Sequence, residues 1–298
     1  MQHNKRHAAA LLAGVLLLTG CGAGNSVPDQ NSGGDLHDMI EVQEARETDL
    51  SKRYPDYFKY CFGDDAQFKY LKSENNSDFY QLTYHDHTGT ERTGEVEVEL
   101  YDFVLDHDDY ASKTEYYNQR MIECVTDQMR KIVRRELAAE VLEPILGGHW
   151  NEEKGWVSDT ESVLLMSDFQ HTAAGMRIAD HRIKSGSGWR VCTADWKSIV
   201  SDELWYLNVS VTIPADTDAS EYTKKFEQIE ERYLNCTDQP KSVSFLLLQK
   251  EPEGSEHSLR PITNKNVILG EEVTQEQYGK DSTPLLYMVS RLKEKYGA

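Results

Sequence analysis

The stretch LWYLNVSVTIPADTDASEYTKKFEQIEERYLNCTDQPKSVSFLLL, residues 204–248, decides the fold class. Its first part, residues 204–213, is rich in β-branched and aromatic side chains, which predicts a strand. The apolar residues that follow recur at helical spacing and would line one face of a helix: Tyr222, Phe226, Ile229 and Tyr233. A second apolar run at 243–249 completes a strand, a helix and a strand.

Strands also dominate the residues around this unit. Apolar segments at 162–169, 176–183 and 189–196 predict a β-meander, with a Ser-Gly turn at 185–188. The first half of the chain predicts helices at 39–60 and 110–142, with strands between them at 66–72, 78–87 and 95–105. Because only one strand-helix-strand unit is visible, the class is α+β, with antiparallel sheets and packed helices.

The break between two predicted domains lies near residue 147. Pro144 and the pair Gly147-Gly148 end the long helical pattern, and about 260 residues after the N-terminal region are enough for two cores. We therefore expect a helix, antiparallel sheet and helix domain at 38–147, and a second domain at 148–298 that contains the meander and the strand-helix-strand unit.

The N-terminus has the layout of an export signal. Lys5 and Arg6 precede an apolar run at 8–18, and the sequence LTGC follows at 18–21. The apolar run is shorter than the roughly 20 residues that a transmembrane helix needs. Residues 1–20 are therefore interpreted as a signal peptide.

The LTGC sequence resembles the lipobox of bacterial lipoproteins. The resemblance implies that the Cys21 thiol receives a lipid with acyl chains such as palmitate, and that a peptidase then cuts before Cys21. The alternative is an ordinary cleaved signal with a chance cysteine, but its A-x-A-like site is absent. The resemblance thus implies a protein anchored by lipid to the bacterial cell membrane, on the extracytoplasmic side, with residues 21–37 as a flexible tether reaching on the order of 20 Å.

The charge of the chain excludes one class of partner. Asp and Glu number 51 against 32 Lys and Arg, which gives a formal charge of −19, and loss of Lys5 and Arg6 with the signal would make it −21. So negative a protein repels the phosphates of nucleic acid. We exclude nucleic acid as a partner.

The cysteines of the predicted folded part leave their pairing open. Cys61, Cys124, Cys192 and Cys236 are an even number in an exported chain, and they allow three pairings. Four buried free thiols are an equally good reading, because a domain of this size does not need disulfides to bury a core.

A histidine and glutamate pattern suggests one metal site. Even-numbered apolar residues on both strands of the hairpin at 78–105 would face the core, so His85, His87, Glu97 and Glu99 would share the outer face. Imidazoles and carboxylates are ligands for zinc. An exposed face with paired opposite charges gives the same pattern without metal, and this second interpretation is the one we prefer.

No recognised catalytic pattern accompanies this hairpin. The sequence contains no HExxH, GxSxG or Walker A motif. We therefore expect a non-enzymatic lipoprotein without a cofactor, which binds a protein, peptide or envelope component outside the membrane. The alternatives are a secreted metal-dependent hydrolase that uses the hairpin face, with zinc as its metal, and, third, the solute-binding receptor of a transporter.

Overall fold

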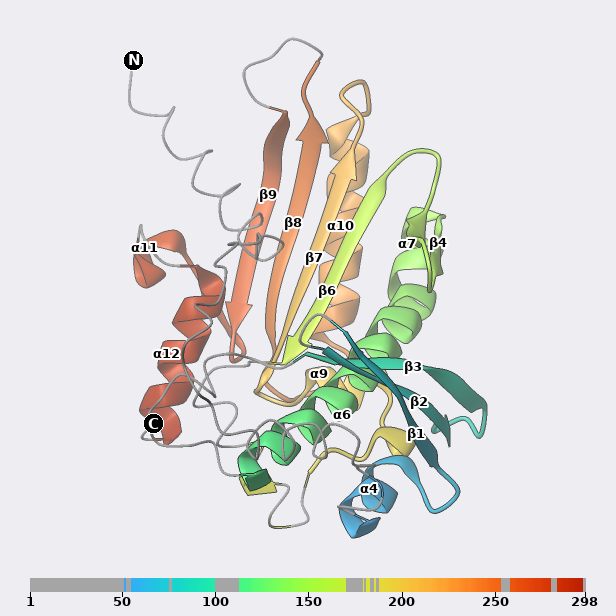
Figure 1. The fold of residues 1–298 in the computed structure, drawn as a ribbon. Coiled ribbons are helices and arrows are strands. Elements are labelled where there is room, and N and C mark those ends of the chain that lie inside the picture. The colour runs from blue at the N-terminus through green and yellow to red at the C-terminus, as the bar shows by residue number, and fades with distance from the viewer. Residues whose placement is uncertain are drawn as a thin grey trace, which may run out of the picture. The chain divides into compact units, whose positions relative to one another are not determined.

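The computed structural model describes residues 51, 55–74, 77–99, 113–169, 179, 181–182, 185, 188–252, 258–279 and 283–296. The predicted signal peptide at 1–20, the lipidation residue Cys21 and the tether at 21–37 lie outside these residues. Within them the chain is α+β, with antiparallel sheets and packed helices (Figure 1). The class predicted from the sequence is confirmed.

The first sheet is an antiparallel meander of β1 (Gln67–Glu74), β2 (Ser77–His85) and β3 (Glu91–Glu99). Its inner face is apolar because alternate side chains of a strand point to the same face. The buried residues on it are Phe68, Tyr80, Leu82, Tyr84 and Val96. Helix α4 (Pro55–Phe62) closes this core, and the rings of Phe58 and Phe68 lie 5.4 Å apart.

One long helix follows the first sheet. Helix α6 (Lys113–Leu137) continues through the π-helical segment η1 (Ala138–Leu142) into α7 (Glu143–Leu146). Of the predicted stop at Pro144 and the Gly147-Gly148 pair, the proline part is wrong, because the wider π turn makes room for a proline ring that would clash with a carbonyl four residues back. The helix ends instead at Gly147, which has φ 91° and accepts a conformation that favours glycine.

The second sheet has five strands in the order β10-β9-β8-β7-β6. Its strands are β6 (Ser162–Phe169), β7 (Trp205–Ile213), β8 (Ser242–Lys250), β9 (Leu259–Ile268) and β10 (Glu271–Val273). Strands β7 and β8 are parallel and joined by α10 (Ala219–Leu234), whereas the other neighbours are antiparallel. The strand-helix-strand unit predicted at 204–249 is confirmed.

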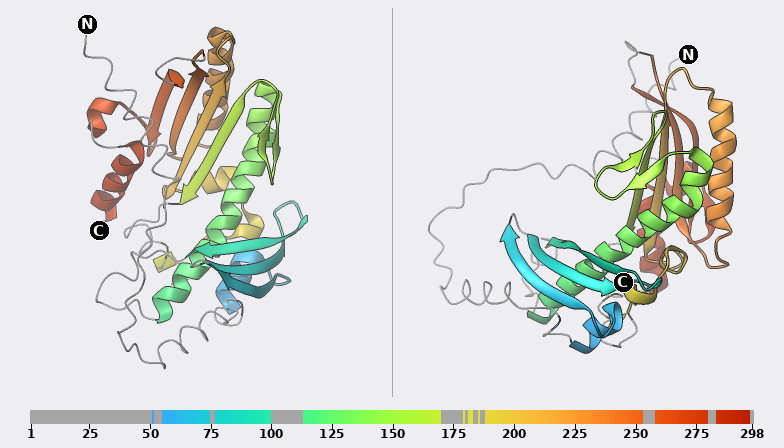
Figure 2. Two further views of the ribbon diagram at one scale, coloured as in Figure 1. Left: turned by 45° about the horizontal axis from the view of Figure 1, so that its top comes forward. Right: turned by 90° about the vertical axis from the view of Figure 1, so that its right-hand side faces the viewer.

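Helix α10 covers one face of the second sheet (Figure 2). Phe226 and Tyr233 place their rings at 6.1 and 5.7 Å from the ring of Phe245 on β8. Since the strand alternates, the odd-numbered residues of β7 and β8 face this helix. The remaining elements are the hairpin β4 (His149–Asn151) and β5 (Gly155–Val157), η2 (Val191–Thr193), α9 (Trp196–Val200), α11 (Gln275–Tyr278) and α12 (Pro284–Tyr296).

The predicted meander is only partly correct. Strand β6 occupies the predicted range 162–169, but Ala179, His181 and Arg182 are helical, and residues 189–196 contain η2 and the start of α9. Alternating apolar residues in a short run do not distinguish a strand from a buried turn. Asp195 decides against a strand, because its side chain accepts a hydrogen bond from Ser198 N at 2.8 Å and caps α9.

The predicted division near residue 147 does not coincide with a gap in the contacts. Residues 46–298 form one compact unit, in which α6 contacts both β3 and β6. The division into domains at 38–147 and 148–298 stays a prediction. No helix among the described residues is both long enough and apolar enough to cross a membrane.

Candidate functional site

The β2–β3 hairpin does not bring the four predicted metal ligands together. Even-numbered residues pair with even-numbered ones, as predicted, but His85 lies opposite Glu91, and Glu97 lies opposite Phe79. Six residues of strand separate Phe79 from His85, which is about 20 Å. Glu99 pairs with Ser77 through its backbone, and its side chain lies outside the described part of the structure.

The face that a residue occupies and the residue that lies opposite it are separate properties of a hairpin. This explains why the prediction of the shared face did not bring the four residues together. Alternation decides which face a residue occupies, whereas the turn decides which residues lie opposite each other. Here the turn is short, with Asp86 N donating to Thr90 O at 2.9 Å. Among the described residues, no group of three His, Cys, Asp or Glu side chains is close enough to hold a metal ion. The zinc site therefore has no assembled ligand set in this part of the chain.

Each histidine of the hairpin has its own carboxylate neighbour. His85 Nδ1 lies 2.6 Å from Asp65 Oδ2, with both side chains about half exposed. His87 Nδ1 lies 3.7 Å from Glu136 Oε1 on α6. Two exposed or partly exposed pairs of this kind contribute little to stability and define no shared centre.

Asp86, which the sequence reasoning did not single out, is the buried acid of the hairpin. It accepts hydrogen bonds from Thr88 N at 2.9 Å, Thr90 N at 3.1 Å and Arg92 Nε at 2.7 Å. Burial alone would raise the pKa of Asp86, but the hydrogen bonds from Thr88 and Arg92 outweigh it and hold the pKa well below its usual range. This residue stabilises the turn.

Helix α6 and η1 fasten α9 through two glutamates. Glu136 Oε2 accepts from Trp196 N at 3.1 Å, and Glu140 Oε2 accepts from Trp196 Nε1 at 2.8 Å. Lys197 Nζ lies 2.5 Å from Glu140 Oε1. Because every charged group here already has a partner, we interpret the cluster as structural.

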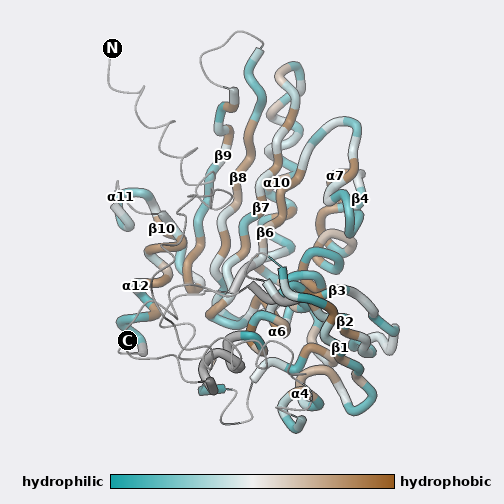
Figure 3. Tube along the Cα trace, in the orientation of Figure 1, coloured by the Kyte–Doolittle hydropathy of each residue, from teal (hydrophilic) through white to brown (hydrophobic). Residues whose placement is uncertain are grey.

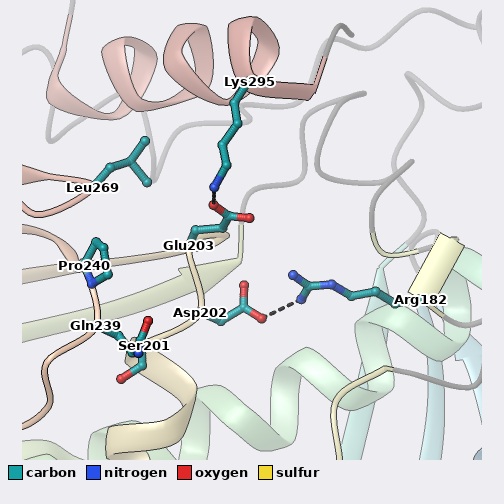
Figure 4. Close-up of a pocket in the computed structure, with 8 residues that line it drawn as sticks. All are labelled: Arg182, Ser201, Asp202, Glu203, Gln239, Pro240, Leu269 and Lys295. Carbon is teal, nitrogen blue, oxygen red and sulfur yellow. Dashed lines mark hydrogen bonds and ion pairs between the residues drawn. The ribbon is translucent and has the colours of Figure 1, made fainter.

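A cavity of about 490 Å³ lies where loops of the second sheet meet α12 (Figure 4). The loop between α9 and β7, the loop between α10 and β8, and the turn between β9 and β10 contribute most of its walls. The lining residues are Arg182, Ser201, Asp202, Glu203, Gln239, Pro240, Leu269 and Lys295. A volume of this size suits a small-molecule ligand.

Two ion pairs line this cavity. Arg182 Nη1 lies 2.5 Å from Asp202 Oδ2, which also accepts from Trp189 Nε1 at 2.9 Å. The Arg182 guanidinium stacks on the Trp189 ring at 5.1 Å, so it is held on two sides. Lys295 of α12 pairs with Glu203 on the opposite side (Figure 4).

The remaining walls are rigid and partly apolar. Lys241 is buried, and its ammonium donates at 2.6 to 3.1 Å to three backbone carbonyls at the end of α10 and in the α10–β8 loop: those of Leu234, Thr237 and Gln239. Leu269 has φ 50° and is the one described residue other than glycine with a positive φ. A leucine in this conformation is strained, and the strain lies in the wall of the cavity.

A second feature is the sheet face opposite α10. Pairing between β6, β7, β8 and β9 gives its middle three adjacent rows, with twelve residues in all, and the rows beyond them include Asp168 and Lys250. The twelve are Met166, Asn208, Ser244 and Asn266; Leu164, Ser210, Leu246 and Asn264; Ser162, Thr212, Leu248 and Pro261. None of them is charged, although 28% of the chain is Asp, Glu, Lys or Arg. We call these twelve residues the charge-free face.

The charge-free face is accessible at its margins and close-packed at its centre. Leu164 is 46% exposed and Ser162 is also exposed, whereas Ser210 and Leu246 are buried between their neighbours. Figure 3 shows apolar stretches along β7 and β8 of this sheet. The buried Asn208 Oδ1 atom, on the row next to Leu164, has no hydrogen-bond partner among the described residues.

The two buried cysteines are poor nucleophiles. All four that the structure describes are unpaired, with Cys61 and Cys124 buried and Cys192 and Cys236 partly exposed. Burial raises the pKa of Cys61 to about 12 and raises the pKa of Cys124 well above its ordinary value. Both thiols are therefore protonated at neutral pH and are poor nucleophiles.

Comparison with protein-family models, with curated proteins and with solved structures finds no match to this chain. The cavity and the charge-free face are thus defined by this chain's own geometry. Sequence reasoning found neither, because each brings together residues from distant parts of the chain.

Proposed function

We propose that the protein is a lipid-anchored extracytoplasmic lipoprotein of a non-enzymatic, binding type. The anchor is supported by the LTGC sequence at 18–21 after a charged and apolar signal. The binding role is supported by one observation above the others, the charge-free face. A tethered protein with such a surface is suited to hold a partner near the membrane.

The chemistry of the face favours a protein as the partner. Centres of protein interfaces are depleted of charged residues, and the twelve residues of the face include none. Four strands and three rows cover on the order of 400 Å². That is about half of what a standard interface buries on each side, so it corresponds to the centre of an interface and leaves room for a rim.

Charge complementarity identifies the kind of protein. The mature chain would carry −21, so two copies repel each other and the face alone is too small to offset the repulsion. A cationic protein is attracted instead. We therefore propose a basic protein partner whose contact patch is uncharged at its centre.

Position-specific photo-crosslinking in the producing cells tests this proposal. A photoreactive amino acid at Ser162, an exposed residue of the face, is expected to give one main adduct with a protein of basic pI. The Leu164→Arg change introduces a charge into the face and is expected to abolish the adduct. Leu71 on β1, which is 41% exposed, is the control position and is expected not to give it.

Several results would contradict the proposal. They are the absence of an adduct from Ser162, an adduct between two copies of this chain, an acidic partner, or the same adduct from Leu71. Retention of the adduct in the Leu164→Arg protein would also contradict it. Thermal unfolding of each variant shows whether a lost adduct reflects a lost fold.

A further inference from the structure

We propose that the cavity between α12 and the loops of the second sheet binds a small zwitterion of the amino-acid or short-peptide class. Its carboxylate would bind Arg182 and its ammonium group would bind Glu203. This inference concerns a second site and does not depend on the protein partner of the charge-free face.

Arg182 has hydrogen-bonding capacity left toward the cavity. A guanidinium carries five N–H donors, and among the described residues only the bond from Nη1 to Asp202 is made. In Figure 4 the second terminal nitrogen of Arg182 has no dashed line and is drawn above the first one, on the side of the guanidinium nearer α12. No described residue pairs with that nitrogen. A carboxylate is the ligand group that matches a guanidinium in charge and geometry.

The guanidinium is also held in place before any ligand arrives. Trp189 lies against it at 5.1 Å and shares Asp202 Oδ2 with it. The other oxygen of Asp202 accepts from Leu204 N at 3.0 Å, so this carboxylate is fully engaged and fixed. A fixed donor loses little conformational entropy on binding, which favours affinity.

Glu203 supplies the opposite charge. One of its carboxylate oxygens contacts Lys295, and the other is drawn without a partner in Figure 4, on the side that faces Arg182. A carboxylate accepts several hydrogen bonds, so Glu203 can bind an ammonium group and keep its pair with Lys295. The two unused groups have opposite charges, and a zwitterion is the small molecule that satisfies both.

The remaining walls suit the side chain of such a ligand. Leu269 and Pro240 form an apolar side of the cavity, across from Arg182 (Figure 4). A volume of about 490 Å³ has room for an amino acid or a dipeptide with an aliphatic side chain. We therefore choose L-leucine and L-leucyl-L-leucine as probes.

Calorimetric titration of the purified mature protein tests the charge requirement. L-leucine or L-leucyl-L-leucine is expected to bind, whereas leucinamide, which has no carboxylate, and N-acetylleucine, which has no ammonium group, are each expected to bind roughly tenfold or more weakly. Absence of binding by both probes up to ~10 mM would refute the proposal. Equal binding of the probes and the two analogues would refute it as well.

Two variants then assign the contacts. Glu203→Gln keeps the size of the side chain and is expected to weaken probe binding roughly tenfold or more, while binding of N-acetylleucine is unchanged. Arg182→Gln is expected to weaken the probe and N-acetylleucine together. Glu221→Gln removes a similar ion pair on α10, 2.9 Å from Lys225, and is the matched control. If Glu203→Gln is folded and binds the probes as the wild type does, Glu203 does not bind the ammonium group and the proposal is wrong. This conclusion holds even if Arg182→Gln does not fold.

Discussion

Arg92 Nε donates to Asp86 Oδ2 at 2.7 Å across the β2–β3 turn, and Arg135 of α6 approaches the same oxygen to 3.6 Å. The buried carboxylate thereby links the hairpin to the long helix. Two guanidinium groups around the Asp86 carboxylate stabilise its charged form. The contribution of Asp86 to the free energy of unfolding should therefore depend on pH.

The Asp86→Asn change is expected to lower the free energy of unfolding by about 2 kcal/mol at pH 7, because charged hydrogen bonds are lost. The pKa of Asp86 is lower in the folded state than the ordinary value of about 3.9, so its contribution is complete above that value and disappears as the pH falls toward the folded pKa. The difference between wild type and variant should therefore shrink below about pH 4. Urea unfolding across pH measures it.

Asp216→Asn is the control for that comparison, since Asp216 is exposed. It is expected to change the unfolding free energy by less than about 0.5 kcal/mol at every pH. A difference for Asp86→Asn that grows on acidification would contradict the role assigned to this carboxylate.

The Cys21→Ser change tests the lipid anchor. It is expected to release the protein from the membrane fraction or to leave it as unprocessed precursor, because the anchoring diacylglycerol cannot attach. Fractionation and mass spectrometry of the N-terminus provide the measurement. Cys236→Ser is the control and should leave the anchor intact. A Cys21→Ser protein that stays mature, membrane-bound and lipid-labelled would show that Cys21 is not the anchor.

The mature domain without Cys21, prepared without reductant, is expected to contain free thiols. Thiol titration in denaturant should detect Cys61, Cys124, Cys192 and Cys236. In the native protein, the partly exposed Cys192 and Cys236 should react first, since Cys61 and Cys124 are buried with raised pKa values. Absence of thiols, with a mass lower by two disulfides, would overturn this prediction.

Replacement of both hairpin histidines by threonine tests the zinc alternative. The double change His85→Thr and His87→Thr is expected to alter stability by less than about 1 kcal/mol, because their carboxylate pairs are exposed or partly exposed. Equimolar zinc is expected to shift the melting temperature of wild type and variant equally, or of neither. A zinc-dependent rise in the wild type alone would support the metal site, since a ligand of the native state stabilises it.

Leu269→Asn tests the strain in the cavity wall. Asparagine tolerates a positive φ and is common in turns of this kind, so the change is expected to raise the unfolding free energy by up to ~1 kcal/mol. Leu286→Asn on α12, at a residue 56% exposed, is the control and should lower it slightly. A large loss for Leu269→Asn would mean that packing of the leucine outweighs its strain.

Local patterns explain which parts of the fold could be predicted. The unit β7–α10–β8 was predictable because its apolar residues repeat at strand and helix spacing within one short stretch. Strand β9 was missed because residues 259–268 include Pro261 and several polar side chains and show no alternation. The segment 189–196 alternates like a strand, but its apolar side chains Trp189, Val191 and Trp196 are buried in turns and a short helix.

The candidate sites could not be predicted for a different reason. In the sequence, Arg182 precedes the β7–α10–β8 unit and Lys295 follows it, and only the tertiary fold brings them to one cavity. The charge-free face depends on the order of four strands, and strand order is set by tertiary packing and crossover connections. Alternation along one strand shows which face of the sheet a residue occupies, but it does not show which residues of other strands lie beside it.

The position of α6 between the two sheets has a consequence for how the protein denatures. Because this helix packs against both β3 and β6, neither sheet can separate from it without exposing buried side chains such as Ile132 and Val133. Loss of one sheet would thus weaken the other, and residues 46–298 should melt in a single cooperative transition. Backbone amides in the middle of α6 should then be among the slowest in the chain to exchange with deuterium, because only global unfolding exposes them to solvent.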